Sequence, residues 1–118
     1  MKSGNLICDF MDQLSVVLAR FPFTNQVDYK IRPAVIISNS RFNKAHNFSW
    51  VCPITSKTSL KEFELELPES EFKGTLKTKS FVRIDTIVSM EKNLFLRKIG
   101  SISPDFFEKM KKELVKNL

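Results

Sequence analysis

The sequence predicts a mainly β protein, in which a small, strongly bent antiparallel sheet or partly closed barrel is followed by a C-terminal helix. Short apolar stretches rich in β-branched residues recur along the chain. One stretch, at 62–67, alternates strictly between acidic and apolar residues, which indicates a half-exposed strand. The last segment has the capping residues and the spacing of an amphipathic helix. Several short strands with one terminal helix are typical of a bent sheet or small barrel.

Six strands follow one another between polar connections. The first is apolar and ends near Pro22, and the second begins with Pro33, which a strand tolerates only at its first residues. Polar segments at 24–31 and 39–47 read as a connection and a basic loop, and Gly74 lies in a third polar stretch. The predicted strands are 14–23, 33–38, 48–55, 62–67, 80–90 and 93–102.

The C-terminal helix is predicted to begin after Ser103. Ser103 is a good N-cap, Pro104 suits the first helical position, and Asp105 lies favourably near the positive end of the helix dipole. The side chains expected to pack on the sheet are Phe107, Met110, Leu114 and Leu118.

Composition narrows the classes of function. The chain has 118 residues, which suits one domain, and 42% hydrophobic content with 3 glycines is not that of a disordered chain. A net charge of +6 and a pI of about 9.5 indicate an acidic partner, either nucleic acid, membrane or protein, or serve solubility alone. Cys8, Cys52 and His46 form no disulfide framework or metal-ligand pattern. Because this cysteine usage suits a reducing compartment and no targeting or membrane segment is visible, we expect a cytoplasmic protein. We also expect no metal and no cofactor.

Two motifs bracket one predicted hairpin. Arg32 opens the strand RPAVIIS, and Thr55 closes the strand VCPITS. If the two strands pair antiparallel, the guanidinium and the hydroxyl meet at one end of the sheet, where they could hold a phosphate of RNA. Two other interpretations stay open: Arg32 could pair with a carboxylate such as Asp28, and Thr55 could simply end a strand.

Arg83 and Asp85 form a second constellation. They are two residues apart on a predicted strand, so both side chains should project from one face. This spacing suits an ion pair that supports the sheet.

The order of these motifs along the chain resembles the MazF/PemK family of toxin endoribonucleases, from about residue 14 to the C-terminus. The resemblance implies an SH3-like barrel of the MazF/PemK/CcdB type, with a toxin domain at 14–118 after an N-terminal extension at 1–13. It also implies a homodimer, a partner antitoxin, and metal-independent cleavage of single-stranded RNA that leaves 2′,3′-cyclic phosphate and 5′-hydroxyl ends. The segments that carry it are VVLARFPFT (16–24), KIRPA (30–34), PITS (53–56), SFVRID (80–85) and RKIGSISP (97–104).

The resemblance also assigns residues. Arg32 and Thr55 match the family's catalytic arginine and threonine, while Arg83 and Asp85 match the acid–base pair of the PemK-like branch, in a catalytic or supporting role. The residues expected to contact RNA around them are Gln26, Tyr29, Lys30, Ser56 and Lys57.

The sequence departs from the family at two places. Leu14 and Ser15 stand where many members have Gly-Asp, and Gln26 stands where the PemK-like branch has a histidine. The second departure favours a mechanism carried by Arg32 and Thr55. Two alternative functions remain: a CcdB-like toxin that binds a protein target, and an inactive relative that binds only RNA or a partner.

Overall fold

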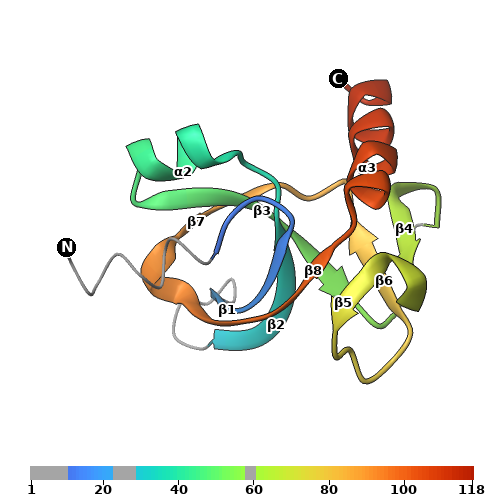
Figure 1. The fold of residues 1–118 in the computed structure, drawn as a ribbon, viewed down its shortest axis with the longest axis horizontal. Helices are drawn as coiled ribbons and strands as arrows, with labels where there is room; N and C mark the ends of the chain where they lie inside the picture. Colours follow the sequence, from blue (N-terminus) through green and yellow to red (C-terminus); the bar gives the residue numbers. More distant parts are fainter. Residues whose placement is uncertain (1–10, 23–28, 58–60) are drawn as a thin grey trace.

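The computed structural model describes residues 11–22, 29–57 and 61–118 (Figure 1). Antiparallel strands dominate it and a helix ends it, so the predicted fold class is confirmed. No described helix is long and apolar enough to cross a membrane. The elements are β1 (Ser15–Pro22), β2 (Tyr29–Ile36), α2 (Ser40–Ala45), β3 (Phe48–Thr55), η1 (Lys61–Phe63), β4 (Glu64–Leu67), η2 (Glu69–Glu71), β5 (Phe72–Gly74), β6 (Ser80–Arg83), β7 (Val88–Glu91), η3 (Lys92–Leu94), β8 (Phe95–Ile102) and α3 (Pro104–Lys116).

The strands form one bent sheet in the order β4-β6-β3-β2-β1-β8-β5, and β7 pairs with β3 outside this path. β3 is the central strand because it changes partner along its length. Its first half pairs with β7, its middle with β2, and its last residues, Ile54 and Thr55, with β6. The two helices lie at opposite ends of the sheet, with α2 beside the start of β3 and α3 above β4, β5 and β6 (Figure 1).

Both faces of the sheet are covered, which gives two hydrophobic clusters. Val16 and Val35 point into the cluster beneath α3, together with Val82 and Phe106. Their neighbours along the same strands, such as Val17 and Ala34, point into the other cluster. This division follows from the two-residue repeat of a strand, and it explains why β1 and β2 read as nearly continuous apolar runs.

The chain enters β1 through a strained residue. Leu14 has φ 77°, in the left-handed region that favours glycine, at the position where many family members carry glycine. Its side chain packs against the cluster beneath α3, and this contact offsets part of the strain. Met11 is 7% exposed and belongs to the second cluster. Residues 1–10, including Cys8, lie outside the described part, and the boundary at residue 14 stays a prediction.

Three connections differ from the prediction. Residues 29–31, expected in a polar connection, belong to β2 because β1 continues to pair with them as far as Pro22 opposite Tyr29. The expected loop at 39–47 contains α2, which begins where the side chain of Asn39 accepts a hydrogen bond from the backbone N–H of Phe42 (2.9 Å).

The polar stretch around Gly74 contains β5, whose Gly74 lies opposite Gly100 of β8. A Cβ at residue 100 would lie 2.2 Å from the carbonyl oxygen of Lys73, so only glycine fits there.

The prediction of a single strand at 80–90 is also wrong. It divides into β6 and β7, and a turn that begins at Ile84 separates them. The turn contains neither glycine nor proline, so the apolar pattern runs through it without interruption.

The cap of α3 is confirmed, but its buried face differs in part. Ser103 Oγ accepts a hydrogen bond from the backbone N–H of Phe106 (3.0 Å), and Pro104 follows as the first helical residue. Phe106 and Met110 are buried, whereas Phe107 is only half-buried. Leu118, expected to pack on the sheet, is 96% exposed because the helix ends at residue 116.

Candidate functional site

The register of the sheet brings Arg32 and Thr55 to neighbouring strands on one face. β2 and β3 pair as far as Ala34 opposite Pro53, and Arg32 and Thr55 lie two residues beyond this last pair, one on each strand. Directly opposed side chains lie on the same face of a sheet, and so do residues two apart on a strand. The two residues therefore share a face at the end of the β2–β3 ladder, as the sequence predicts.

The face that carries Arg32 and Thr55 continues across the next strands. Thr55 pairs with Phe81 of β6, and Phe81 pairs with Glu66 of β4. Two residues along, Arg83 of β6 pairs with Glu64 of β4 on the same face. The two predicted pairs, Arg32–Thr55 and Arg83–Asp85, thus come from adjoining parts of one surface.

The Arg32 side chain is half-buried. Within 11–22, 29–57 and 61–118 it has neither an ion pair nor a side-chain hydrogen bond. Asp28, the carboxylate weighed as its partner, lies outside the described residues. Lys30 is exposed and lies two residues from Arg32, on the same face of β2. Two cationic side chains therefore stand together at this end of the sheet, which suits a phosphate.

The hydroxyl of Thr55 organises the turn that follows β3. Its Oγ1 accepts a hydrogen bond from the backbone N–H of Lys57 (3.2 Å). It donates to the carbonyl oxygen of Lys57 over 3.3 Å, which is long for a hydroxyl donor. The first contact fixes the position of the oxygen, and the second is weak enough for a phosphate oxygen to replace.

Arg83 is fully engaged with carboxylates. Its Nε and Nη2 donate to Asp85 Oδ1 (3.0 Å) and Oδ2 (2.9 Å), and Glu64 Oε2 lies 3.4 Å from Nε. Asp85 lies in the turn after β6 and not on a strand, so the expectation that both residues project from one strand is wrong. The ion pair forms because the turn brings the carboxylate back to the guanidinium.

The hydrogen bond with Arg83 is the main cause that lowers the pKa of Asp85 below its ordinary value, and the hydroxyl of Thr86 adds to it. The same bond raises the pKa of Arg83. A third ionisable group, the Cys52 thiol, has its pKa raised to about 12, chiefly by burial and then by the charge of Asp85. Cys52 therefore stays a neutral thiol and serves as a core residue.

The Arg83–Asp85 pair makes a pH-dependent prediction. Arg83→Ala should raise the pKa of Asp85 towards the ordinary carboxyl value of about 3.9. Because the folded pKa is the lower one, the pair stabilises the fold above about pH 4 and loses this contribution as the pH falls through the folded pKa. NMR titration of the Asp85 carboxyl carbon in both proteins measures the shift. Identical titration curves would contradict the assigned cause.

Glu64 is a member of this surface that sequence reasoning missed. The alternation at 62–67 predicts that its glutamates face solvent or a basic segment, and Glu64 is 7% exposed beside Arg83. Neither carboxylate oxygen has a hydrogen-bond partner among the described residues. The nearby charge of Arg83 compensates the burial, and only knowledge of the β4–β6 register could have indicated it.

The other predicted RNA contacts divide between two faces. Ser56 and Lys57 are exposed in the turn after Thr55, close to the proposed site. Tyr29 is 56% exposed, but it lies three residues from Arg32 and so projects from the opposite face of β2. Gln26 lies outside the described residues. Their role as RNA contacts remains a prediction.

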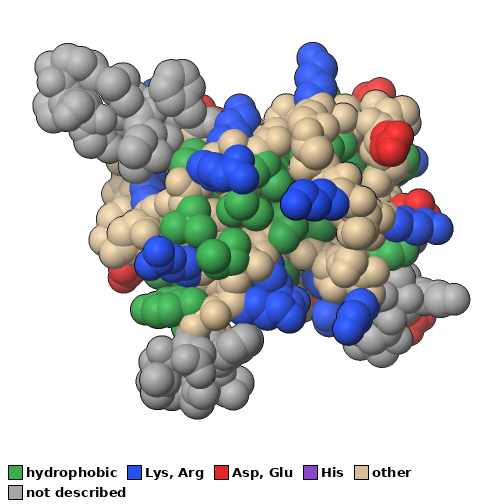
Figure 2. Space-filling model, turned by 90° about the horizontal axis from the view of Figure 1, so that it is seen from below, with side chains coloured by type: hydrophobic (Ala, Val, Ile, Leu, Met, Phe, Trp, Pro, Cys, Tyr) green, Lys and Arg blue, Asp and Glu red, His purple; other side chains and the backbone are tan. Residues whose placement is uncertain are grey.

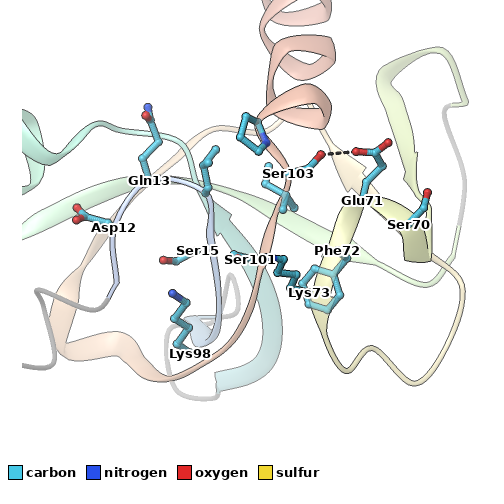
Figure 3. A pocket seen from close by; sticks show the side chains of 13 residues that line it. Asp12, Gln13, Ser15, Ser70, Glu71, Phe72, Lys73, Lys98, Ser101 and Ser103 are labelled. Carbon is cyan, nitrogen blue, oxygen red and sulfur yellow. Dashed lines mark hydrogen bonds between the residues drawn. The ribbon is translucent and has the colours of Figure 1, made fainter.

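A cavity of about 540 Å³ lies elsewhere, between the start of β1, β5, β8 and the N-terminus of α3 (Figure 3). Ser15, Lys98 and Ser101 lie on one side of it, and on the other Ser103 donates a hydrogen bond to Glu71. None of the predicted catalytic or RNA-binding residues lines it. Within the described ranges, no group of three or more His, Cys, Asp or Glu side chains is arranged to hold a metal ion.

A family model described as "PemK-like, MazF-like toxin of type II toxin-antitoxin system" matches residues 12–118. The chain belongs to this family. The match covers the whole surface that carries Arg32, Thr55, Arg83 and Asp85, and the resemblance inferred from the motifs is therefore confirmed. No curated protein matches the chain.

Solved structures of MazF-like toxins share the fold. MazF in a MazE–MazF complex from Deinococcus radiodurans aligns with a TM-score of 0.73 and 22% identity, over 90% of this chain and 94% of that one. An endoribonuclease from a mycobacterial species aligns with a TM-score of 0.69 and 15% identity, over 88% and 86%. The Mycobacterium tuberculosis toxin MazF-mt6 aligns at 0.67 and 19%, over 87% and 93%. The expected MazF-type barrel is thus confirmed for this MazF-like chain.

Proposed function

We propose that this MazF-like chain is an endoribonuclease that cuts single-stranded RNA without a metal ion. The observation that carries the proposal is that Arg32 and Thr55 lie two residues beyond the last pair of the β2–β3 ladder, where Arg32 has no ion-pair partner among the described residues. The mycobacterial endoribonuclease, which aligns with 88% of this chain, supports the same activity. The basic charge of the chain also favours RNA.

The face of the molecule seen in Figure 2 carries many basic side chains. Seen from below, where β1, β2 and β8 lie, Lys and Arg side chains surround a patch of exposed hydrophobic side chains, with few acidic ones (Figure 2). Exposed apolar members of these strands include Tyr29 and Ile31 of β2 and Leu96 of β8. Tyr29 and Ile31 project from the face of β2 opposite to Arg32. This surface therefore suits the phosphates and bases of a single strand outside the proposed cleavage site.

The proposed reaction is transesterification within the RNA. The 2′-oxygen attacks the adjacent phosphorus, the bond to the 5′-oxygen breaks, and the proton of the 2′-hydroxyl is transferred overall to the leaving oxygen. The products are a 2′,3′-cyclic phosphate and a 5′-hydroxyl. Arg32 stabilises the charge that develops on the phosphoryl oxygens, and the Thr55 hydroxyl donates to one of them. Lys30 and Lys57 hold neighbouring phosphates.

Arg83 and Asp85 take a supporting role in this proposal. The two donors of Arg83 that face Asp85 are occupied, and Glu64 adds a second negative charge beside it. A guanidinium so compensated attracts a phosphate less than Arg32 does, since Arg32 has no carboxylate partner among the described residues. The pair instead fixes the turn after β6 and the edge of the site.

The same proposal includes two partners. A MazE–MazF complex among the structural neighbours supports an antitoxin as the partner that controls this chain. A second copy of the chain, as a homodimer, follows from the family resemblance. With no described helix able to span a membrane, we place this activity in the cytoplasm.

The Thr55 hydroxyl gives a test of the proposal. With a chelator present, Thr55→Val should lower the rate of cleavage of a long single-stranded RNA roughly 100-fold, because a donor to the phosphoryl oxygen is lost. Thr55→Ser keeps the hydroxyl and should stay near wild type. A quantitative cleavage assay with folded proteins, freed of bound antitoxin, measures both. Equal activity of the valine and serine variants would remove Thr55 from the site, and an inactive wild type would overturn the proposal.

A further inference from the structure

Four aromatic rings form one continuous surface over α2 and the start of β3. The ring of Phe42 stacks on His46 with 4.2 Å between centroids and lies 4.3 Å from Trp50. Phe48 closes the group, 4.8 Å from His46 and 5.6 Å from Phe42. Trp50 is 41% exposed and His46 is also exposed, so the cluster presents ring surface to solvent. We call these four residues the ring cluster.

A buried polar network holds the ring cluster in place. Asn43 of α2 is 4% exposed, and its Oδ1 accepts hydrogen bonds from the hydroxyls of Ser38 and Ser49. Ser38 Oγ in turn accepts from the backbone N–H of Trp50 (3.0 Å). The ammonium of Lys92 donates to the carbonyl of Asn43. A helix of six residues is not stable alone, so these contacts fix the rings in advance of binding.

Two cations of α2 border the ring cluster, and Glu91 lies opposite Phe48 on its other side. Arg41 and Lys44 of α2 are exposed, and neither forms an ion pair with a described residue. The sequence of α2 contains no acidic residue. A cavity of about 430 Å³ lies against the cluster, lined among others by Asn39, Arg41, His46 and Trp50.

We propose that the ring cluster is a second contact for single-stranded RNA, at which unpaired bases stack on Trp50 and His46 while Arg41 and Lys44 hold the adjoining phosphates. Stacking on exposed aromatic rings beside free cations is the usual way in which proteins hold single strands without reading sequence. A protein partner fits less well, because the ring surface is small and bordered by cations and amides. The inference rests on the proposed function for the identity of its ligand.

The ring cluster is separate from the proposed cleavage site. Trp50 and Thr55 are five residues apart on β3, or about 17 Å along the strand, and their odd separation places them on opposite faces. The cluster therefore cannot touch the reacting phosphate. It would retain RNA that extends beyond the cut, so it should affect long substrates and leave short ones unchanged.

The experiment uses the only tryptophan of the chain as its probe. Oligonucleotides with 2′-O-methyl groups cannot be cut by attack of the 2′-oxygen, so they report binding alone. Those of about 16 nucleotides should quench the Trp50 fluorescence, whereas those of about 4 should not at the same concentration. Fluorescence anisotropy of labelled RNA then compares variants: Trp50→Ala should weaken binding of the longer RNA about 10-fold. Trp50→Phe should retain most of the affinity, and Ile87→Ala, at another exposed apolar residue, should have no effect.

The outcomes separate this inference from the proposed function. Binding that depends on Trp50 in a protein that does not cut RNA would support the inference and overturn only the proposed function. Active wild type whose long-RNA binding is unchanged in Trp50→Ala would overturn the inference alone. A change of oligomeric state in Trp50→Ala, by light scattering, would show a protein interface instead. If Trp50→Ala does not fold, the double variant R41Q and K44Q decides: unchanged affinity for the longer RNA contradicts the inference.

Discussion

Replacing Arg32 with alanine is expected to lower kcat for RNA cleavage about 100- to 1,000-fold, while the protein keeps its fold. The change removes the charged donor that faces the phosphoryl oxygens, and Arg32 has no described partner whose loss would unfold the sheet. Arg32→Lys keeps the charge but cannot form two parallel hydrogen bonds, so its rate should lie between wild type and alanine. Single-turnover cleavage of a defined RNA measures all three.

A matched control for this experiment is Arg20→Ala. Arg20 is exposed on β1 and pairs with Ile31, so its side chain projects from the face opposite to Arg32. Loss of this arginine changes the net charge equally but should leave kcat unchanged. If both variants lost activity to the same extent, general charge and not the position of Arg32 would explain the effect.

The second large effect concerns stability. Phe106→Ala should lower the free energy of unfolding by about 3–5 kcal/mol. The ring of this α3 residue is 2% exposed in the cluster between the helix and the sheet, so its removal leaves a cavity. Leu118→Ala, at the 96% exposed end of the chain, should change it by less than about 0.5 kcal/mol. Urea unfolding followed by circular dichroism compares the two variants. A cost at residue 118 that equals the cost at residue 106 would mean that the helix buries another face.

The elements predicted correctly are those whose local pattern agrees with their packing. β3 runs over 48–55 as predicted, because its β-branched residues are buried and polar segments bound it. The cap at Ser103 is recognisable because serine, proline and an acid occur together at the start of α3. Elements set by distant partners were missed. β5 has only three residues, and α2 is too short to show a helical repeat.

The candidate site shows the same division. From sequence, Arg32 and Thr55 could be assigned to the same end of two neighbouring antiparallel strands, because a short connection fixes which strand ends meet. The burial of Glu64 could not be predicted, because it depends on β4 pairing with β6 across 12 residues of intervening chain, and no local pattern indicates this pairing. The ring cluster could not be predicted from the sequence for a related reason. His46 lay in an expected loop, and only α2 brings it against Phe42 and Phe48.

The most direct test of the proposed chemistry is a single change in the substrate. An RNA that is cut at one mapped position by the wild-type protein, in the presence of a chelator, is prepared again with a 2′-deoxy nucleotide immediately 5′ of the scissile phosphate. If the 2′-oxygen is the nucleophile and no metal takes part, the unmodified RNA gives 5′-hydroxyl ends and the modified RNA is not cut at that position. Cleavage of the modified RNA at the same position, or activity that the chelator abolishes, would contradict the account.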